Sequence, residues 1–140
     1  MTSTMTQSVL TTSGADAICA AAAARADELS VNVSIAVLDT AGVMKAFTRL
    51  DGAPMASVSV AQDKAFCAAS TSTPTKAWTD IATADPVFGA GLPSLPRFTL
   101  LFGGVPITVD GTVVGAVGIS GGSNDQDEDI AQAGVAALAG

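Results

Sequence analysis

The segment 103–131, "GGVPITVDGTVVGAVGISGGSNDQDEDIA", decides the fold, because two apolar runs flank an Asp-Gly pair and a polar stretch follows them. Asp110-Gly111 is a strong signal for a two-residue hairpin turn. The runs on either side, 105–109 and 112–120, are rich in β-branched residues and are predicted to be strands. We therefore expect an antiparallel hairpin here, followed by a helix.

Counting outward from this turn predicts the register of the hairpin. Ile107 is expected opposite Val114, and Pro106 opposite Gly115. Because proline removes a donor from the hydrogen-bond ladder, Pro106 favours an edge strand or a bulge. Gly115 and Gly118 lie on opposite faces, so we expect another part of the chain to approach the backbone closely on each side.

The glycines around the hairpin raise the question of a phosphate site. Ser123 and Gln126 have the spacing of a capping box, and acidic side chains crowd the first turns of the helix expected over about 124–139. Those carboxylates complement the helix dipole and would repel a phosphate. The second glycine pair is thus interpreted as a helix cap. Gly103-Gly104 is interpreted as a bulge or tight turn, or as two amides that face a ligand.

The rest of the chain predicts one α+β domain over 12–140, after a flexible lead over 1–11. Its sheet is expected to have five strands, mainly antiparallel, with helices covering one side. In "VNVSIAVLD" the side chains of Val33, Ile35 and Val37 share one face. The expected helices are 12–29, 55–71 and 75–85; the other expected strands are 31–39, 43–50 and 98–102; and 86–98 is expected to be an extended loop.

Composition narrows the functional classes. The 140 residues carry a net charge of −7, and their six Lys and Arg are too few and too scattered for a nucleic-acid surface. The chain has no His and no Tyr, so no metal site is expected. No run is long enough to span a membrane, and no basic residue precedes "AICAAAAA", which favours a cytoplasmic protein over an exported one. Low charge and small residues favour a homo-oligomer.

Three residues are candidates for chemistry. Arg49 ends the second strand, and Asp51 follows it in the loop, either as a local ion pair or as a carboxylate clamp with a base. Lys64 lies at the edge of a helical apolar stripe, from which its ammonium would reach a cleft. We expect Arg49 and Lys64 to serve function more than folding, so that replacing Lys64 with Met would leave the fold intact.

Three motifs in combination resemble the GlcG/HbpS family, also described as the haem-degrading-like domain. They are "VLDTAG" at 37–42, "RLDGA" ahead of "AQDKA" within 49–65, and "GGVPI" through "QDEDIA" within 103–131. The resemblance runs from about Thr12 to Leu138. It implies a profilin-like sandwich with a five-stranded antiparallel sheet, assembled into homo-oligomers, often dimers that build octamers.

The resemblance also implies a function. The expected ligand is a haem-like tetrapyrrole or another anionic planar molecule, with Arg49 and Lys64 pairing to its carboxylates and Gly103, Gly104 and Val105 in contact with it. Without His or Tyr, a haem iron would rely on Thr, Met, Cys or Lys as ligand. The alternative is a cofactor-free isomerase, lyase or hydratase acting on a small carboxylate. In that case Arg49 is the clamp, and Lys64 or Asp51 is the acid–base group.

Overall fold

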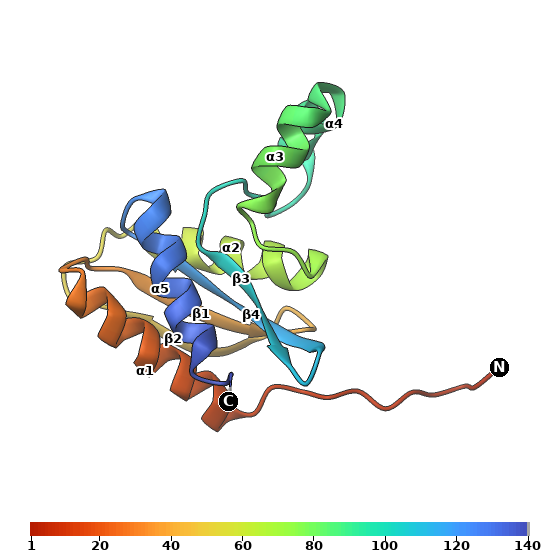
Figure 1. Cartoon of the computed structure of the whole chain (residues 1–140), viewed down its shortest axis with the longest axis horizontal. Helices are drawn as coiled ribbons and strands as arrows, with labels where there is room; N and C mark the ends of the chain where they lie inside the picture. The colour runs from red at the N-terminus through yellow and green to blue at the C-terminus, as the bar shows by residue number, and fades with distance from the viewer. Residues whose placement is uncertain (140) are drawn as a thin grey trace.

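The computed structural model describes residues 1–139, so Gly140, the last residue of the predicted domain, lies outside the described part. Figure 1 shows the course of the chain. In chain order the elements are α1 (Thr12–Glu28), β1 (Ser34–Asp39), β2 (Met44–Arg49), α2 (Ser57–Thr71), α3 (Ala77–Ala84), α4 (Pro86–Gly91), the 3-10 helix η1 (Leu92–Ser94), β3 (Gly104–Val109), β4 (Thr112–Ser120) and α5 (Asn124–Ala136).

The four strands form one antiparallel sheet in the order β2-β1-β4-β3. This confirms the α+β class with an antiparallel sheet, but the expected fifth strand over 98–102 is wrong. Arg97 (φ 56°) and Gly103 (φ 110°) both adopt left-handed backbone conformations, which interrupt extended structure at both ends of that segment. The apolar segment between them therefore runs as a connection to the edge strand β3.

The hairpin between β3 and β4 turns at Asp110 and Gly111, both with positive φ, as a type I′ turn requires. The register slips between Ile107 and Thr108, so Ile107 lies opposite Gly115 and not opposite Val114. A bulge at this point adds one residue to β4 and shifts every later pair. Both expected pairs, Ile107 with Val114 and Pro106 with Gly115, are therefore wrong by one residue, whereas an edge position and a bulge in the Pro106 hairpin are confirmed.

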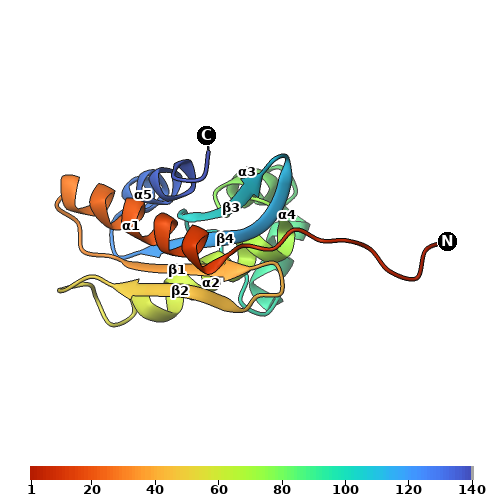
Figure 2. The ribbon, with the colours of Figure 1, turned by 90° about the horizontal axis from the view of Figure 1, so that it is seen from below.

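Helices cover both faces of the sheet, so the expectation of a single covered face is wrong. Figures 1 and 2 show α1 and α5 together on one face and α2 on the other. Val33, Ile35 and Val37 are buried in the core beneath α1 and α5. On the opposite face, Ala36 and Leu38 pack against α2. Because β1 carries apolar side chains in both directions, it is buried between two layers.

Gly115 and Gly118 allow the close backbone approaches that the sequence predicts. A Cβ atom at Gly118 would collide with the carbonyl of Ala61 on α2, and would lie 2.6 Å from the amide nitrogen of Ala65. A Cβ atom at Gly115 would collide with the carbonyl of Leu38 on β1. The glycine at 118 therefore lets α2 lie directly on the backbone of β4.

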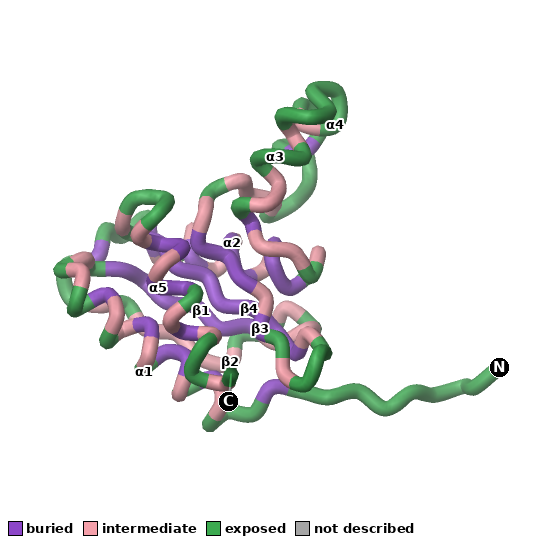
Figure 3. Tube along the Cα trace, viewed as in Figure 1, coloured by how far each residue is buried: buried purple, intermediate pink, exposed green. Residues whose placement is uncertain are grey.

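Residues 77–98, here called the helical arm, leave the body of the molecule (Figure 1). They comprise α3, α4, η1 and a short return segment, so the extended loop expected over 86–98 is wrong in part. Asp85 caps α4 by accepting a hydrogen bond from the amide of Phe88, and Pro86 begins the helix. Figure 3 shows that the arm is exposed along most of its length. Among residues 77–98 only Leu92 is buried.

The amino-terminal residues before α1 form an extended segment that projects away from the body of the molecule (Figure 1). Leu10 is buried against the core, and Gln7 donates a side-chain hydrogen bond to the hydroxyl of Thr40. Within residues 1–139, no helix is both long enough and apolar enough to cross a bilayer.

Candidate functional site

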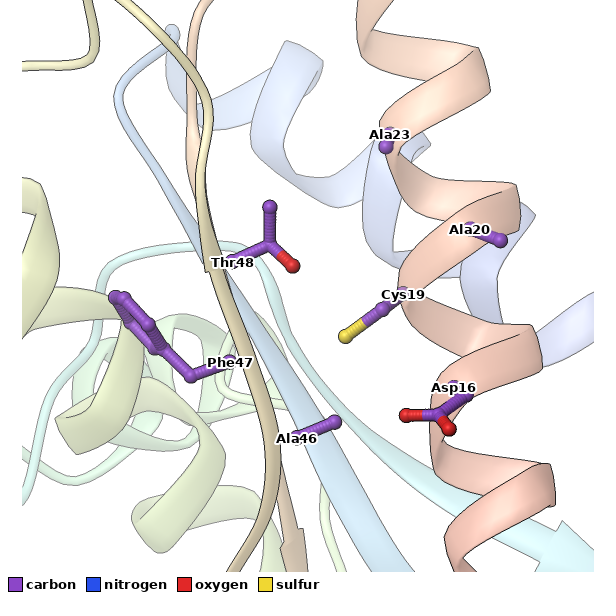
Figure 4. A pocket seen from close by; sticks show the side chains of 7 residues that line it. All are labelled: Asp16, Cys19, Ala20, Ala23, Ala46, Phe47 and Thr48. Carbon is purple, nitrogen blue, oxygen red and sulfur yellow. The ribbon is translucent and has the colours of Figure 1, made fainter.

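An open groove of about 440 Å³ lies between α1 and the edge strand β2; its walls are formed by Asp16, Cys19, Ala20, Ala23, Ala46, Phe47 and Thr48. Figure 4 shows Asp16 and Cys19 facing Ala46 and Thr48 across it, while the Phe47 ring points to the other face of the sheet. Small side chains keep α1 and β2 from filling the space between them. The volume falls in the range of roughly 300–1,000 Å³ that is usual for ligand sites.

The groove contains three groups that can contact a metal or a polar ligand atom, namely the carboxylate of Asp16, the thiol of Cys19 and the hydroxyl of Thr48. Cys19 is only 8% exposed. Burial raises the pKa of its thiol, the Asp16 carboxylate raises it further, and Thr48 acts in the opposite direction. The thiol is therefore protonated at neutral pH. Among the described residues, no three His, Cys, Asp or Glu side chains gather in a way that would hold a metal ion.

Lys64 lies in the interior, so the cleft position expected for its ammonium is wrong. Its residue surface is 2% exposed, and Nζ donates to the carbonyl of Ile119 at 2.7 Å and to Oδ2 of Asp127 at 3.0 Å. The other carboxylate oxygen of Asp127 accepts from the amide of Gly122 at 2.8 Å. Burial lowers the pKa of Lys64, and Asp127 opposes that effect. Lys64 thus joins α2 to β4 and to the start of α5.

The backbone amides of Gly103 and Gly104 are engaged by side chains of the chain itself. Gly103 donates to Oε2 of Glu128 at 3.2 Å, and Gly104 donates to the hydroxyl of Thr75 at 3.0 Å. A Cβ atom at Gly104 would collide with the carbonyl of Lys64, so β3 passes very close to α2 here. Val105 is buried in the core between the sheet and the helices α1 and α5.

Arg49 lies at the end of β2 and is exposed, as is Asp51 in the following loop. The guanidinium donates from Nε and Nη2 to the carbonyl of Ala53, at 3.1 Å and 2.7 Å. Within residues 1–139 no ion pair joins Arg49 to Asp51, although the sequence left that pairing open. The loop after β2 therefore fixes the direction of the arginine and leaves its outer edge in solvent.

The structure divides the candidate residues into two sets. Lys64, Gly103 and Gly104 belong to one buried network at the start of α5, together with Asp127 and Glu128. Arg49 shares no hydrogen-bond partner with that network. The two cations therefore hold different parts of the fold and do not clamp one ligand between them.

Most of this chain matches a known protein family. The family described as "Haem degrading protein HbpS-like" matches residues 10–136. The chain belongs to the HbpS-like family. Protein GlcG of Escherichia coli K12 is similar to it, with 36% identity over 115 residues that cover 82% of this chain and 84% of GlcG.

Solved structures of relatives share the fold of this HbpS-like chain. HbpS matches with a TM-score of 0.88 and 34% identity, over 97% of this chain and 94% of that one. A PduOC:heme complex matches with a TM-score of 0.85 and 30% identity, over 94% of this chain and 96% of that one. Similarity at this level over nearly the whole length places the sheet and the three covering helices in equivalent positions.

Sequence reasoning missed two features of the site in this HbpS-like chain. Asp127 and Glu128 were interpreted as dipole-complementing carboxylates at the start of α5, where Ser123 and Gln126 do form the expected capping box. A lysine that is buried in the core needs an acidic partner. The presence of Lys64 in an apolar stripe was therefore the signal that could have indicated a buried role for Asp127. The second feature is the position of Cys19 in the groove, because no pattern in the sequence places it beside Thr48 of β2.

Proposed function

We propose that this chain binds a haem-like tetrapyrrole, or another anionic planar molecule, in the groove between α1 and β2. The observation that carries the proposal is the open groove itself, with its walls of small side chains at Ala20, Ala23 and Ala46. A flat ring makes contact with both walls of such a groove without displacing a large side chain. The PduOC:heme complex supports the choice of ligand, because that relative has the same fold.

The residues that line the groove fit the ring better than they fit a tightly held iron. The thiolate form of cysteine is the metal ligand, and the raised pKa keeps Cys19 in the thiol form. A neutral threonine hydroxyl such as that of Thr48 is also a weak ligand. A bound haem would supply a redox-active iron, but apolar contact with the ring supplies most of the affinity in this proposal.

Arg49 follows Thr48 on β2, so its side chain points, with that of Phe47, to the face of the sheet opposite the groove, and it is not among the residues that line the groove. Its guanidinium is exposed and is oriented by the Ala53 carbonyl. It can contact a carboxylate only of a ligand that extends around the free edge of β2, and the proposal gives it that role. Lys64, Gly103, Gly104 and Val105 support the ligand indirectly, by holding β3, β4 and α5 in place. The cofactor-free enzyme with Asp51 as acid–base group stays a prediction.

The test of this function is a parallel titration with hemin and with metal-free protoporphyrin IX. If the ring supplies the affinity, the two dissociation constants agree within about tenfold, and the hemin Soret band shifts without the spectrum of a thiolate-ligated iron. Absorbance and quenching of Trp78 fluorescence give the two constants. The proposal is wrong if neither compound binds, or if hemin binds a hundredfold more tightly than the metal-free ring.

A further inference from the structure

The groove between α1 and β2 carries a charge at one end only. Asp16 is the one charged residue among those that line it. Figure 4 shows the Asp16 carboxylate directed toward Ala46, at the end of the groove away from Ala23 and Thr48. On α1, Asp16 and Ala23 are separated by roughly 10 Å, at 1.5 Å per residue. The two ends of the groove therefore present different surfaces to a ligand, one acidic and one neutral.

No cation of the chain neutralises the acidic end. Asp16 is exposed, and within residues 1–139 its side chain forms no ion pair. Lys45 precedes Ala46 on β2 but is not among the residues that line the groove. The positive end of the α1 dipole lies at Thr12, and its effect falls off within the first turn, whereas Asp16 lies in the second. A ligand group at this end of the groove therefore meets an uncompensated negative charge.

Cys19 shows that this charge acts inside the groove. Burial is the main cause that raises the pKa of its thiol, and the Asp16 carboxylate raises it further. The carboxylate thus disfavours a second negative charge one helical turn away from it. A ligand carboxylate in the same place would be disfavoured for the same reason, because a bound ring excludes the water that would otherwise screen the two charges.

The neutral end of the groove leads toward a cation. Arg49 follows Thr48 on β2, and its exposed guanidinium lies beyond the free edge of that strand. A ligand carboxylate that extends around this edge is attracted by Arg49, whereas a carboxylate at the other end is repelled by Asp16. The charges at the two ends therefore favour one orientation of an anionic ligand over the reverse.

We infer that Asp16 is a selectivity residue, which admits only the uncharged edge of a planar ligand and turns the ligand carboxylates toward Thr48 and the free edge of β2. This inference rests on the function proposed above and narrows its ligand class. A ring with its carboxylates on one edge, such as protoporphyrin IX, fits the groove. A ring with a carboxylate on every side, such as coproporphyrin III, is disfavoured, because one carboxylate faces Asp16 in every orientation.

The experiment compares the dissociation constants of protoporphyrin IX and coproporphyrin III, measured from porphyrin absorbance and fluorescence. The wild-type chain is expected to bind protoporphyrin IX about tenfold more tightly or better. Asp16→Asn keeps the shape of the side chain and removes its charge, so the ratio of the two constants should fall about threefold or more, through tighter binding of coproporphyrin III. Asp27→Asn is the matched control, because Asp27 is an exposed acid of the same helix that does not line the groove.

The ionic strength gives a second readout of the same repulsion. Added salt screens exposed charges, so it should lower the wild-type ratio toward that of Asp16→Asn. Unchanged thermal midpoints check that both variants fold. If neither porphyrin binds the wild-type chain, the proposed function fails and this inference fails with it. If protoporphyrin IX binds but Asp16→Asn keeps the wild-type ratio, the proposed function stands and the role given to Asp16 is wrong.

Discussion

Gly118→Ala is expected to lower the free energy of unfolding by about 3 kcal/mol or more, which is at or above the upper end of the usual cost of overpacking a core. The added methyl group would collide with the Ala61 carbonyl and lie 2.6 Å from the Ala65 amide nitrogen. Both atoms belong to the backbone of α2, so no side-chain rotation relieves the clash. α2 would have to move away from β4 and leave its own side of the core partly open.

Gly91→Ala is the matched control for this substitution. A Cβ atom at Gly91 meets no other atom within 4 Å. Replacing a helical glycine by alanine without a clash is expected to be neutral or to stabilise by up to about 1 kcal/mol. Chemical denaturation of the two variants gives the comparison. Equal stability of Gly118→Ala and the wild type would show that α2 does not lie on β4 as described.

Lys64→Met is expected to lower the free energy of unfolding by about 3–5 kcal/mol, because it leaves the buried Asp127 carboxylate without its counter-charge. This is the opposite of what the sequence predicts for the substitution. The prediction treated the lysine as a cleft-facing cation, whereas its ammonium is bonded to Asp127 and to the Ile119 carbonyl in the interior.

Two further variants separate the loss of a buried pair from other effects of the Lys64→Met substitution. Lys76→Met removes a half-exposed cation 3.5 Å from Glu128, and should cost about 0–1 kcal/mol. Adding Asp127→Asn to Lys64→Met should recover part of the lost stability, because the buried charge is removed while the amide of Gly122 keeps an acceptor. A Lys64→Met chain as stable as Lys76→Met would contradict the buried ion pair.

Local signals in the sequence predicted the hairpin and most of the elements. Asp110-Gly111 fixed one turn, and the spacing of Ser123 and Gln126 fixed the start of α5. The start of α4 had a readable signal in Asp85-Pro86, which was interpreted as a loop because prolines and glycines follow. The apolar side chains of Ala36 and Leu38 already indicated a second covered face of the sheet.

The candidate site was harder to predict, because it depends on contacts between distant segments. Lys64 and Asp127 are 63 positions apart, and neither residue type alone indicates which carboxylate a lysine meets in the core. Similarly, Cys19 and Thr48 face one groove only because α1 crosses the edge strand. Family motifs identified the family and the α+β class with an antiparallel sheet, but they did not locate the groove.

The affinity of hemin for Ala20→Phe, measured beside Ala136→Phe, tests most directly whether the groove between α1 and β2 binds the ligand. Ala20 is an exposed residue of α1 that lines this groove, and Ala136 is an exposed residue of α5 that lines a second hollow of about 370 Å³ beside β3. Phenylalanine at 20 fills the proposed site, so we predict at least tenfold weaker binding, with wild-type affinity for Ala136→Phe. Wild-type affinity for Ala20→Phe would contradict the account.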